Sequence, residues 1–398
     1  MTKATIDDID VAGRRVLLRT DFNVPFSDGE IGDDRRIREA LPTLEALRDR
    51  GARTTIVTHL GRPRGLVVPK LSVVPIAARL AELLHAPVAV ARDVAGPSAQ
   101  LTVDRLRDGE VAMLENVRFE PGEEANASAL AERLASFGDV FVNDAFGTAH
   151  RAHASTAGVA RYLPAVAGLL MARELDVLGS VLHDARAPVV AILGGSKIST
   201  KLGVLRNLLG RVDSMHVGGA MACTFFRARG VSTGRSLVEE DLVGVAAGLL
   251  ESAVGSRCTL HFPLDVVVAA GPSSDYEPTI VPWDAIPDDA MVVDIGPRSV
   301  AAIAADVATA GTVVWNGPLG IYEVEEFARA TRMVARKVGE SRAVTVIGGG
   351  DLGAAVEDAG VADCIDFIST GGGATLEFLE GRLLPGVEAL RDRTAVAP

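Results

Sequence analysis

Four β-branched runs in the first half of the sequence are each followed by arginine, histidine, asparagine or aspartate. Ligands bind at the carboxyl ends of strands in open parallel sheets, so we expect these side chains to converge. Arginine suits phosphate and carboxylate because its guanidinium offers two parallel N–H donors. The set predicts a site for a small, doubly anionic ligand, with Asp21 and Asn23 available for its hydroxyls. The residues are Asp21, Asn23, His59, Arg62, Arg118, Asn143, Asp144, His150, Arg151 and His153.

Three of these residues, His59, His150 and His153, could instead indicate a metal site. Arginine neighbours repel a cation, however, and the sequence has no H-E-x-x-H spacing. Any one of the arginines alone is best explained as a solvated loop charge. For the whole set we favour the anion site.

Glycine-rich turns follow the β-branched runs of the second half and predict a second, phosphate-binding site. Lys197 and Lys201 follow the first turn four residues apart, which predicts that they share one face of a helix's first turns. Helix N-termini offer unpaired N–H groups to phosphate, and lysines add point charges. Each glycine turn alone is equally well explained as a tight strand-to-helix connection. Together they indicate a polyphosphate ligand, although no Walker loop is present. Other residues assigned to this site are Asn316, Glu323 as a ribose-hydroxyl acceptor, Asp351 and the turns at 348–353 and 371–373.

Gly348, Gly350 and Gly353 fall on the G-x-G-x-x-G spacing of a dinucleotide fingerprint. That interpretation needs an acidic residue about 20 residues further on to bind the ribose. Ser369, Thr370 and Gly371 occupy that position, and none is acidic. Asp351 lies inside the fingerprint, where a negative charge beside phosphates makes sense if it binds Mg²⁺. A nicotinamide enzyme is therefore a minor alternative.

The elements that must position these residues alternate between uniformly apolar, β-branched runs and Ala/Leu-rich segments with helical periodicity. Uniformly apolar strands favour a parallel sheet buried on both faces, and the alternation predicts α/β layers. The expected strands lie at 14–20, 53–59, 110–116, 139–144, 188–195, 265–270, 311–317, 343–349 and 364–370. Residues 163–185 are predicted to form one long helix without a strand, connecting two domains. The alternative is a surface helix of a single larger domain.

Composition limits the classes of function. A chain of 398 residues predicts two or three domains, and a net charge of −12 argues against a general polyanion-binding role. Aromatic residues make up 4% of the chain, too few to favour a base-stacking surface for nucleic acid. Three widely spaced cysteines fit a reducing compartment. No signal peptide or membrane-spanning run is expected, so the prediction is a cytoplasmic protein.

With these motifs in place, the sequence resembles the phosphoglycerate kinase family over nearly its whole length. The segments that carry the resemblance, in the family's order, are RTDFNVP, DDRRIREALPTL, THLGRP, LLENVRF with PGEEAN, FVNDAFGTAHRAHAST, GGSKISTK, VGGAMACTF, FPLDVVVA, VDIGPRS, VWNGPLGIYE, IGGGDLGAA and STGGGATLEFLEG.

The resemblance implies an α/β fold of two Rossmann-like lobes, each a parallel sheet covered by helices on both faces, joined by a long interdomain helix. The N-terminal lobe is expected at 1–165, with a C-terminal tail from about 380 to 398 packed on it. The interdomain helix is expected at 166–185 and the C-terminal lobe at 186–379.

The resemblance also implies the ligands and their contacts. In the N-terminal lobe, the residues for 3-phosphoglycerate or 1,3-bisphosphoglycerate would be Asp21, Asn23, Arg36, His59, Arg62, Arg118 and Arg151. In the C-terminal lobe, those for Mg-ADP or Mg-ATP would be Lys201, Asn316, Glu323, Gly349, Gly350, Asp351, Leu352 and Gly353. Asp351 would bind the Mg²⁺.

The resemblance further implies direct phosphoryl transfer when the hinge between the lobes closes. We expect a monomer without nucleic-acid or membrane partners. An acyl phosphate is already reactive, so catalysis needs positioning and charge neutralisation. Arg36, Lys197 and the N–H groups near Gly349 and Gly372 are the expected catalytic groups.

Three positions depart from the family's pattern, all on the nucleotide side. Thr200 stands where aspartate is usual, Leu352 where a hydroxyl residue is usual, and Val292 where glycine is usual. These departures motivate an alternative hypothesis, a catalytically weak paralogue with a binding or regulatory role.

Overall fold

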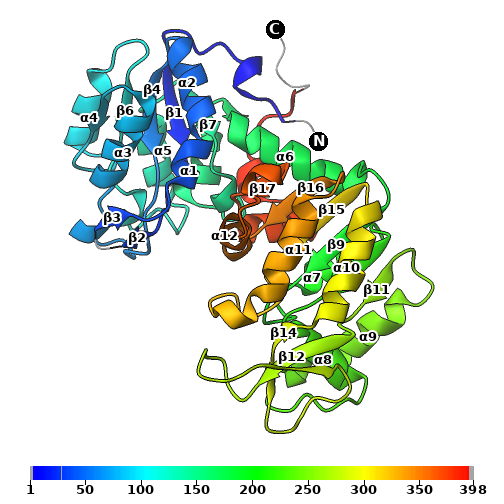
Figure 1. Cartoon of the computed structure of the whole chain (residues 1–398). Helices are drawn as coiled ribbons and strands as arrows, with labels where there is room; N and C mark the ends of the chain where they lie inside the picture. Colours follow the sequence, from blue (N-terminus) through cyan, green and yellow to red (C-terminus); the bar gives the residue numbers. More distant parts are fainter. Residues whose placement is uncertain (1–2, 28, 394–398) are drawn as a thin grey trace. The chain divides into compact units, whose positions relative to one another are not determined.

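The computed structural model describes residues 3–27 and 29–393, and these fall into two compact units (Figure 1). Unit 1 holds the described residues up to Asp176 and those from Leu383 on, and unit 2 holds Val177–Arg382. Each unit contains a six-stranded sheet whose pairings are all parallel. The expected α/β fold with two parallel sheets is confirmed.

The sheet of unit 1 has the strand order β5-β6-β4-β1-β7-β8. Val16 and Leu18 of β1 pack with Leu44 and Ile76 of two covering helices, and the residue between them, Leu17, is also buried. Burial on both faces explains why these strands are uniformly apolar. The strands are β1 (Arg15–Arg19), β4 (Arg53–Val57), β5 (Val88–Val90), β6 (Val111–Met113), β7 (Val140–Asn143) and β8 (Ala165–Ala167), beside a hairpin of β2 (Phe26–Ser27) and β3 (Glu30–Ile31). The helices are α1 (Arg35–Glu39), α2 (Leu41–Asp49), α3 (Val74–Leu84), α4 (Pro97–Asp104), α5 (Ser128–Ala135) and α14 (Pro385–Glu388).

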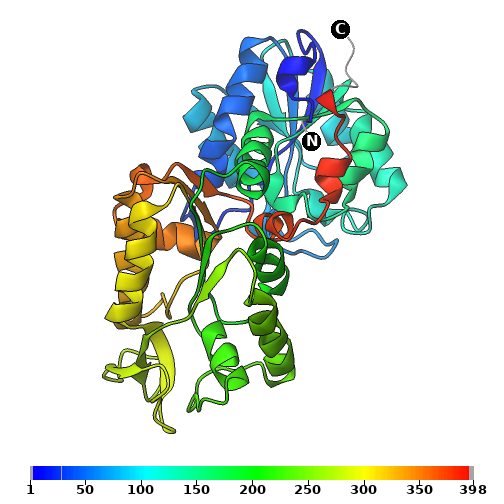
Figure 2. The same ribbon diagram turned by 90° about the vertical axis from the view of Figure 1, so that its right-hand side faces the viewer.

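The last described residues pack on unit 1 (Figure 2, red). The backbone N–H of Gly386 donates to the carbonyl of Ala149 over 2.8 Å, and that of Arg391 donates to Ala165 over 3.0 Å. The N–H of Ala4 in turn donates to Arg391 over 2.9 Å, so segments from both ends of the chain are held together.

The main sheet of unit 2 has the order β11-β10-β9-β15-β16-β17. One face packs Val190, Ile192 and Trp315 against three helices, α10, α11 and α12. Its strands are β9 (Val189–Leu193), β10 (Ser214–Val217), β11 (Thr259–His261), β15 (Thr312–Asn316), β16 (Val344–Gly348) and β17 (Phe367–Ser369). The helices of this unit are α7 (Leu202–Leu209), α8 (Met221–Ala228), α9 (Val243–Ala253), α10 (Pro297–Thr309), α11 (Arg329–Gly339), α12 (Gly350–Asp358) and α13 (Gly373–Leu379).

Unit 2 also contains a second sheet. Here β12 (Asp265–Ala269) pairs antiparallel with both β13 (Thr279–Pro282) and β14 (Met291–Ile295). The run at 265–270 is therefore a strand, but it belongs to this small antiparallel sheet and not to the parallel one. A short apolar run does not reveal which sheet a strand joins.

The connecting helix differs from the expectation at its start. Residues 165–167 form the edge strand β8, paired with β7, and α6 spans Leu169–His183. The expectation of a strand-free segment from 163, with a helix from 166, is wrong. Gly168 separates the strand from the helix, and the Ala/Val composition of 165–167 suits either structure.

Short helical turns connect these elements. They are η1 (Ile6–Asp8), η2 (Pro69–Leu71), η3 (Val117–Phe119), η4 (Phe146–Thr148), η5 (Ala154–Gly158), η6 (Val159–Arg161), η7 (Glu240–Leu242), η8 (Glu325–Phe327) and η9 (Ala362–Cys364).

Candidate active site

The carboxyl ends of the unit 1 strands are tied together by side-chain hydrogen bonds. Asn23, after β1, accepts the backbone N–H of Gly61, after β4, at its Oδ1 over 2.8 Å. The carbonyl of Gly61 accepts from Nη1 of Arg118, after β6, over 2.7 Å. Three strand-end loops thus form one hydrogen-bonded rim, as parallel strands in adjacent positions require.

His59 lies in the middle of this rim and is surrounded by cations. Burial lowers the pKa of His59 well below its usual value, and the charges of Arg19, Arg118 and Arg36 lower it further. Its Nδ1 lies 3.3 Å from Nη2 of Arg19, and a guanidinium only donates, so Nδ1 accepts. The neutral imidazole therefore carries its proton on Nε2. Its 3.6 Å approach to Asp21 is accordingly not an ion pair.

Arg36 reaches the rim from α1. Its Nη1 donates to Oδ2 of Asp21 over 3.0 Å and to the carbonyl of Asn23 over 3.3 Å. A third of the Arg36 side chain remains exposed (33%). The guanidinium is thus oriented by Asp21 and still accessible to a ligand.

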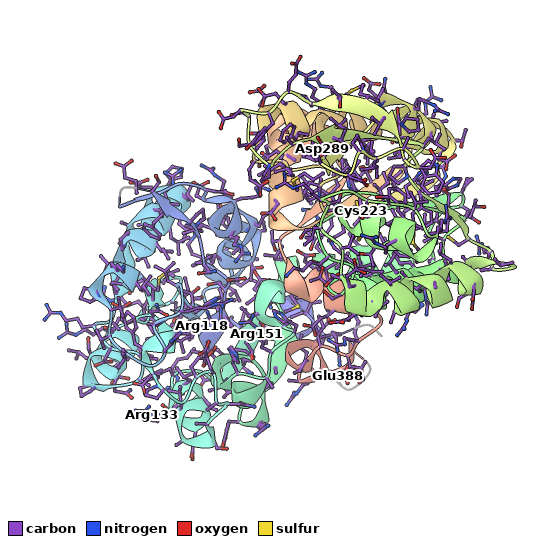
Figure 3. All side chains as sticks on the ribbon, turned by 90° about the horizontal axis from the view of Figure 1, so that it is seen from below. Arg118, Arg133, Arg151, Cys223, Asp289 and Glu388 are labelled. Atoms are coloured by element: carbon purple, nitrogen blue, oxygen red, sulfur yellow. The ribbon has the colours of Figure 1, made fainter. Side chains whose placement is uncertain are left out.

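Arg118 and Arg151 lie near each other in unit 1 (Figure 3). Burial lowers the pKa of Arg118, Glu124 opposes this, and the charges of Arg19 and Arg151 lower it further. Arg151 is exposed and donates from Nε to His150 Nε2 over 3.0 Å. Arg62 is also exposed, and its side chain makes no hydrogen bond or ion pair within the described residues. Several guanidinium groups thus lie close together here, each with an acid beside it or exposed, and the exposed ones remain available to an anionic ligand.

Two members of the expected set do not join the rim. Asn143 donates from Nδ2 to the carbonyl of Gly386 over 3.2 Å, beneath the C-terminal segment. Asp144 is buried and accepts the N–H of Met171 at the start of α6 over 3.1 Å. Burial raises the pKa of Asp144 to about 6. Asn143 ends β7 and Asp144 follows it, but their side chains bind the C-terminal segment and the start of α6 respectively, so their assignment to the ligand set is wrong.

Two buried charged residues were missed. Arg19, at the end of β1, is 1% exposed and donates from Nε to Ser155 Oγ over 2.9 Å. Glu123 accepts the same hydroxyl over 2.6 Å. Burial acts to raise the pKa of Glu123, but hydrogen bonds from His153 and Ser155 and the charge of Arg19 hold it below its usual value. An arginine inside an apolar strand run was the available signal for Arg19.

Unit 2 contains a cavity of about 340 Å³ at the carboxyl ends of its strands. Glu323 and Asp351 contribute acidic groups to its lining, and Val292 contributes an apolar one. The backbone contributes glycines from several loops, which allow close approach of a ligand. These include Gly195, Gly219 and Gly320.

Lys201 lies close to this cavity, beside Gly195 of its lining, and within electrostatic range of Asp351. Lys201 is 6% exposed, and burial lowers its pKa to about 8, against the opposing effect of the Asp351 carboxylate. At neutral pH the ammonium is still mostly protonated. A buried cation next to a glycine-rich pocket that has an acid in its lining suits a metal-bound polyphosphate.

Lys197 and Lys201 do not share a helix face. The helix α7 begins only at Leu202, residues 196–201 form bends and a turn, and Thr200 Oγ1 donates there to the carbonyl of Lys197 over 2.9 Å. Lys197 is exposed and Lys201 is buried. The expectation of lysines on a helix's first turns is wrong, because an extra turn follows the glycine pair.

The G-x-G-x-x-G segment joins β16 to α12. Gly349 has φ 110°, a conformation that favours glycine, and precedes the first residue of the helix, Gly350. Asp351 is exposed in the first turn, whereas Leu352 is 0% exposed and belongs to the apolar core. Only the backbone N–H of Leu352 could therefore reach a phosphate. A hydroxyl residue at position 352 would point into the core, so the leucine removes no hydroxyl from a ligand surface.

Asn316 holds the neighbouring loops. It is buried, its Nδ2 donates to the carbonyl of Gly348 over 2.8 Å, and its carbonyl accepts the N–H of Gly194 over 2.9 Å. Gly372, with φ 54°, makes the turn into α13. The hydrogen bonds of Asn316 thus hold the carboxyl ends of β9, β15 and β16 together in one surface.

Asp294 is a further pocket residue that sequence reasoning missed. It is 2% exposed and accepts the N–H of Ile295 at Oδ1 and that of Ala330 at Oδ2, each over 2.9 Å. Burial raises the pKa of Asp294 to about 7 despite these hydrogen bonds. Within the described residues no cation is paired with it.

Two parallel-sheet units, one with a cationic rim and the other with a glycine-rich pocket, are the arrangement expected of a kinase that acts on a small anionic substrate. The chain belongs to the phosphoglycerate kinase family, since the family model "Phosphoglycerate kinase" matches residues 6–382.

Curated relatives and solved structures agree with this assignment. The phosphoglycerate kinase of Pelotomaculum thermopropionicum is 53% identical over 393 residues, covering 99% of this chain and 100% of that protein. That of Chloroflexus aurantiacus is 51% identical over 398 residues, covering 98% and 100%. The structure of the Coxiella burnetii phosphoglycerate kinase matches with a TM-score of 0.87 at 40% identity, covering 97% and 98% of the two chains. That of the Pyrococcus horikoshii OT3 enzyme matches with 0.86 at 33% identity, covering 98% of each.

The comparisons give no support to the alternative of a weak paralogue. No helix in the described part of the chain is long and apolar enough to cross a membrane.

Proposed function

We propose that this chain is a phosphoglycerate kinase, which transfers a phosphoryl group reversibly between 1,3-bisphosphoglycerate and Mg-ADP to give 3-phosphoglycerate and ATP. The observation that carries the proposal is the ring of guanidinium groups around a neutral His59 in unit 1. A substrate with a phosphate at one end and a carboxylate at the other matches that charge.

In unit 1, the ligand for this site would be oriented by hydrogen-bond donors and acceptors of different kinds. The guanidiniums of Arg36, Arg62, Arg118 and Arg151 would bind its anionic ends. Asp21, Asn23 and the Nε2–H of His59 would bind the hydroxyl and the remaining oxygens. Bidentate arginine contacts fix direction as well as charge.

In unit 2, Mg-nucleotide would occupy the cavity of about 340 Å³. Lys201 and the backbone N–H groups of 349–353, Leu352 included, would bind phosphate, while Glu323 would accept from the ribose. Asn316 would keep their loops in place. Asp351 fits a Mg²⁺ ligand because it is an exposed carboxylate on the pocket wall. The metal, when bound, would neutralise phosphate charge.

Transfer itself would need no covalent intermediate, because an acyl phosphate is already a reactive donor. Arg36, Lys197 and the N–H groups near Gly349 and Gly372 would stabilise charge on the moving phosphoryl group. Movement of the units about α6 would bring the ligands together and exclude water, which would otherwise hydrolyse the acyl phosphate. We further propose a cytoplasmic monomer that binds no nucleic acid.

A coupled assay tests this function. Purified protein is supplied with 3-phosphoglycerate and Mg-ATP, and product is followed as NADH oxidation through glyceraldehyde-3-phosphate dehydrogenase. Activity that depends on both substrates is expected. No activity above a control lacking the protein would overturn the proposal.

A further inference from the structure

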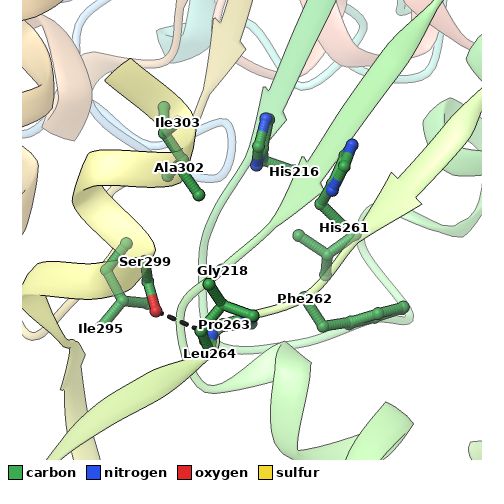
Figure 4. Close-up of a pocket in the computed structure, with 11 residues that line it drawn as sticks. His216, Gly218, His261, Phe262, Pro263, Leu264, Ile295, Ser299, Ala302 and Ile303 are labelled. Atoms are coloured by element: carbon green, nitrogen blue, oxygen red, sulfur yellow. Dashed lines mark hydrogen bonds between the residues drawn. The ribbon is translucent and has the colours of Figure 1, made fainter. Parts of the chain in front are cut away.

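Two histidines and an aspartate meet in unit 2, outside the nucleotide cavity. His216 lies on β10, His261 is its register partner on the adjacent strand β11, and Asp306 lies on α10. The two imidazoles stack with their centroids 4.7 Å apart and 15° between their planes (Figure 4). Three separate elements therefore bring nitrogen or oxygen ligand atoms close together.

The distances are close to those around a single small ion. The nearest ligand atoms of the three side chains all lie within 4.8 Å of one another. Asp306 Oδ2 is 2.8 Å from His216 Nε2 and 3.7 Å from His261 Nε2. Two ligands bound tetrahedrally at about 2.0 Å are roughly 3.3 Å apart, a value between these two distances.

The cluster combines one fixed ligand with two adjustable ones. The His216 side chain is 6% exposed, whereas those of His261 and Asp306 are 39% and 34% exposed. Ser214 Oγ donates to Asp306 Oδ2 over 2.7 Å, which orients the carboxylate as an outer-shell partner does. For both imidazole nitrogens to meet one ion, the partly exposed His261 ring must turn out of the stack toward His216 and Asp306.

The protonation state of the buried histidine is compatible with metal binding. The Nε2 of His216 lies 2.8 Å from Asp306 Oδ2, and a carboxylate only accepts, so Nε2 carries the proton and donates it to this hydrogen bond. An ion at Nε2 requires that proton to move to Nδ1, a change of tautomer without a change of charge.

We propose that His216, His261 and Asp306 form a binding site for a divalent transition-metal ion of the Zn²⁺ type. Two imidazole nitrogens and one carboxylate are a ligand set that Zn²⁺ uses with a water in the fourth position. An adjoining cavity of about 60 Å³, lined by both histidines, has room for that water. Imidazole ligands select against Mg²⁺, so this site is distinct from the reaction's own metal.

The ion would fasten an edge of the sheet. β11 is the outermost strand of the six, and its described residues are only partly covered or exposed. A metal held by β10, β11 and α10 would join this strand to the body of unit 2. If the cluster were only a hydrogen-bonded network of Ser214, Asp306 and His216, the second imidazole would not be needed.

Metal retention by the full-length protein tests the site. Chelator-treated protein is dialysed against Zn²⁺ at neutral pH without nucleotide, and bound zinc is measured by atomic emission. We expect one bound equivalent, and binding at least about tenfold weaker in Asp306→Asn and in His261→Gln. Both residues are partly exposed, so these variants should fold, and near-ultraviolet circular dichroism checks that they do.

His183→Gln, which changes an exposed histidine on α6, is the matched control and should retain the equivalent. Tetrahedral Co²⁺ bands in the visible spectrum, lost in Asp306→Asn, would support the geometry. Zinc retained equally by all variants, no zinc retained by the unaltered protein, or displacement of zinc by equimolar Mg²⁺ would each overturn the proposal.

Discussion

Arg36 Nη1 donates to Asp21 Oδ2 over 3.0 Å, joining the helix α1 to the carboxyl end of β1. The pair holds one guanidinium in place while a third of its side chain stays exposed. Arg36 also contributes to the cationic field that keeps His59 neutral. A ligand anion can therefore meet a preoriented cation at this point.

Arg36→Ala should lower kcat by about 10²–10³-fold, because it removes a positioned charge from the transferring group. Nucleotide affinity should change by less than about threefold, since Arg36 belongs to unit 1. Steady-state kinetics and calorimetry with Mg-ADP measure the two quantities. Arg38→Ala, on the same helix and paired with Asp34, is the control and should leave kcat unchanged. Equal losses in kcat and in nucleotide affinity would contradict the role assigned to Arg36.

The affinity for Mg-ADP should fall between pH 7 and pH 9. The pKa of Lys201 is about 8, so this ammonium loses its proton across that range and with it the attraction for phosphate. The decrease should be about tenfold and should be absent in Lys201→Met, which binds weakly at every pH. Calorimetry in two buffers of different ionisation enthalpy would also detect proton uptake at pH 8. A pH dependence that persists in Lys201→Met would show that another group is responsible.

Asp294 should make unit 2 less stable as the pH rises. Its folded pKa is about 7 and its reference value 3.8, so the native state holds a proton that the unfolded chain has released. The stabilisation is complete below about pH 4 and is lost as the pH approaches and passes 7. Asparagine at this position cannot titrate. The difference in the free energy of unfolding between the unaltered protein and Asp294→Asn should therefore change by about 3 kcal/mol between pH 5 and pH 8.

Urea unfolding followed by tryptophan fluorescence measures this difference, because both tryptophans, Trp283 and Trp315, lie in unit 2. Identical pH profiles for the two proteins would rule out a raised pKa for Asp294.

Leu352→Thr should destabilise the protein without improving nucleotide binding. The substitution places a hydroxyl and a smaller side chain in a fully buried apolar position, at a cost of about 2–4 kcal/mol. Affinity for Mg-ADP should stay within about twofold, and Leu352→Met, which keeps the volume, should cost less than about 1.5 kcal/mol. A tenfold gain in affinity for Leu352→Thr would mean that position 352 does face the nucleotide.

The fold was largely predictable because its strands are buried on both faces and its helices are amphipathic. Prediction failed where the apolar patterns were short. Residues 165–167 suit a strand or a helix, and residues 265–269 pair antiparallel with segments distant in the sequence. Neither pairing partner is encoded within the run itself.

The site was predictable to the level of strand ends but not of side-chain direction. Asn143 and Asp144 lie at the carboxyl end of β7 like true rim residues, yet tertiary packing turns them toward Gly386 and α6. Leu352 sits in the fingerprint, yet the helical period of α12 points it into the core. The raised pKa of Asp294 depends on burial, which sequence spacing does not report.

Trapping of the acyl phosphate tests the central proposal most directly. The protein is incubated with 3-phosphoglycerate, Mg-ATP and hydroxylamine, which converts an acyl phosphate to a hydroxamate, and hydroxamate and ADP are both quantified. We expect the two products in equal amounts, with neither formed when 3-phosphoglycerate is omitted. ADP without hydroxamate, or neither product with both substrates present, would contradict phosphoryl transfer to the carboxyl group of 3-phosphoglycerate.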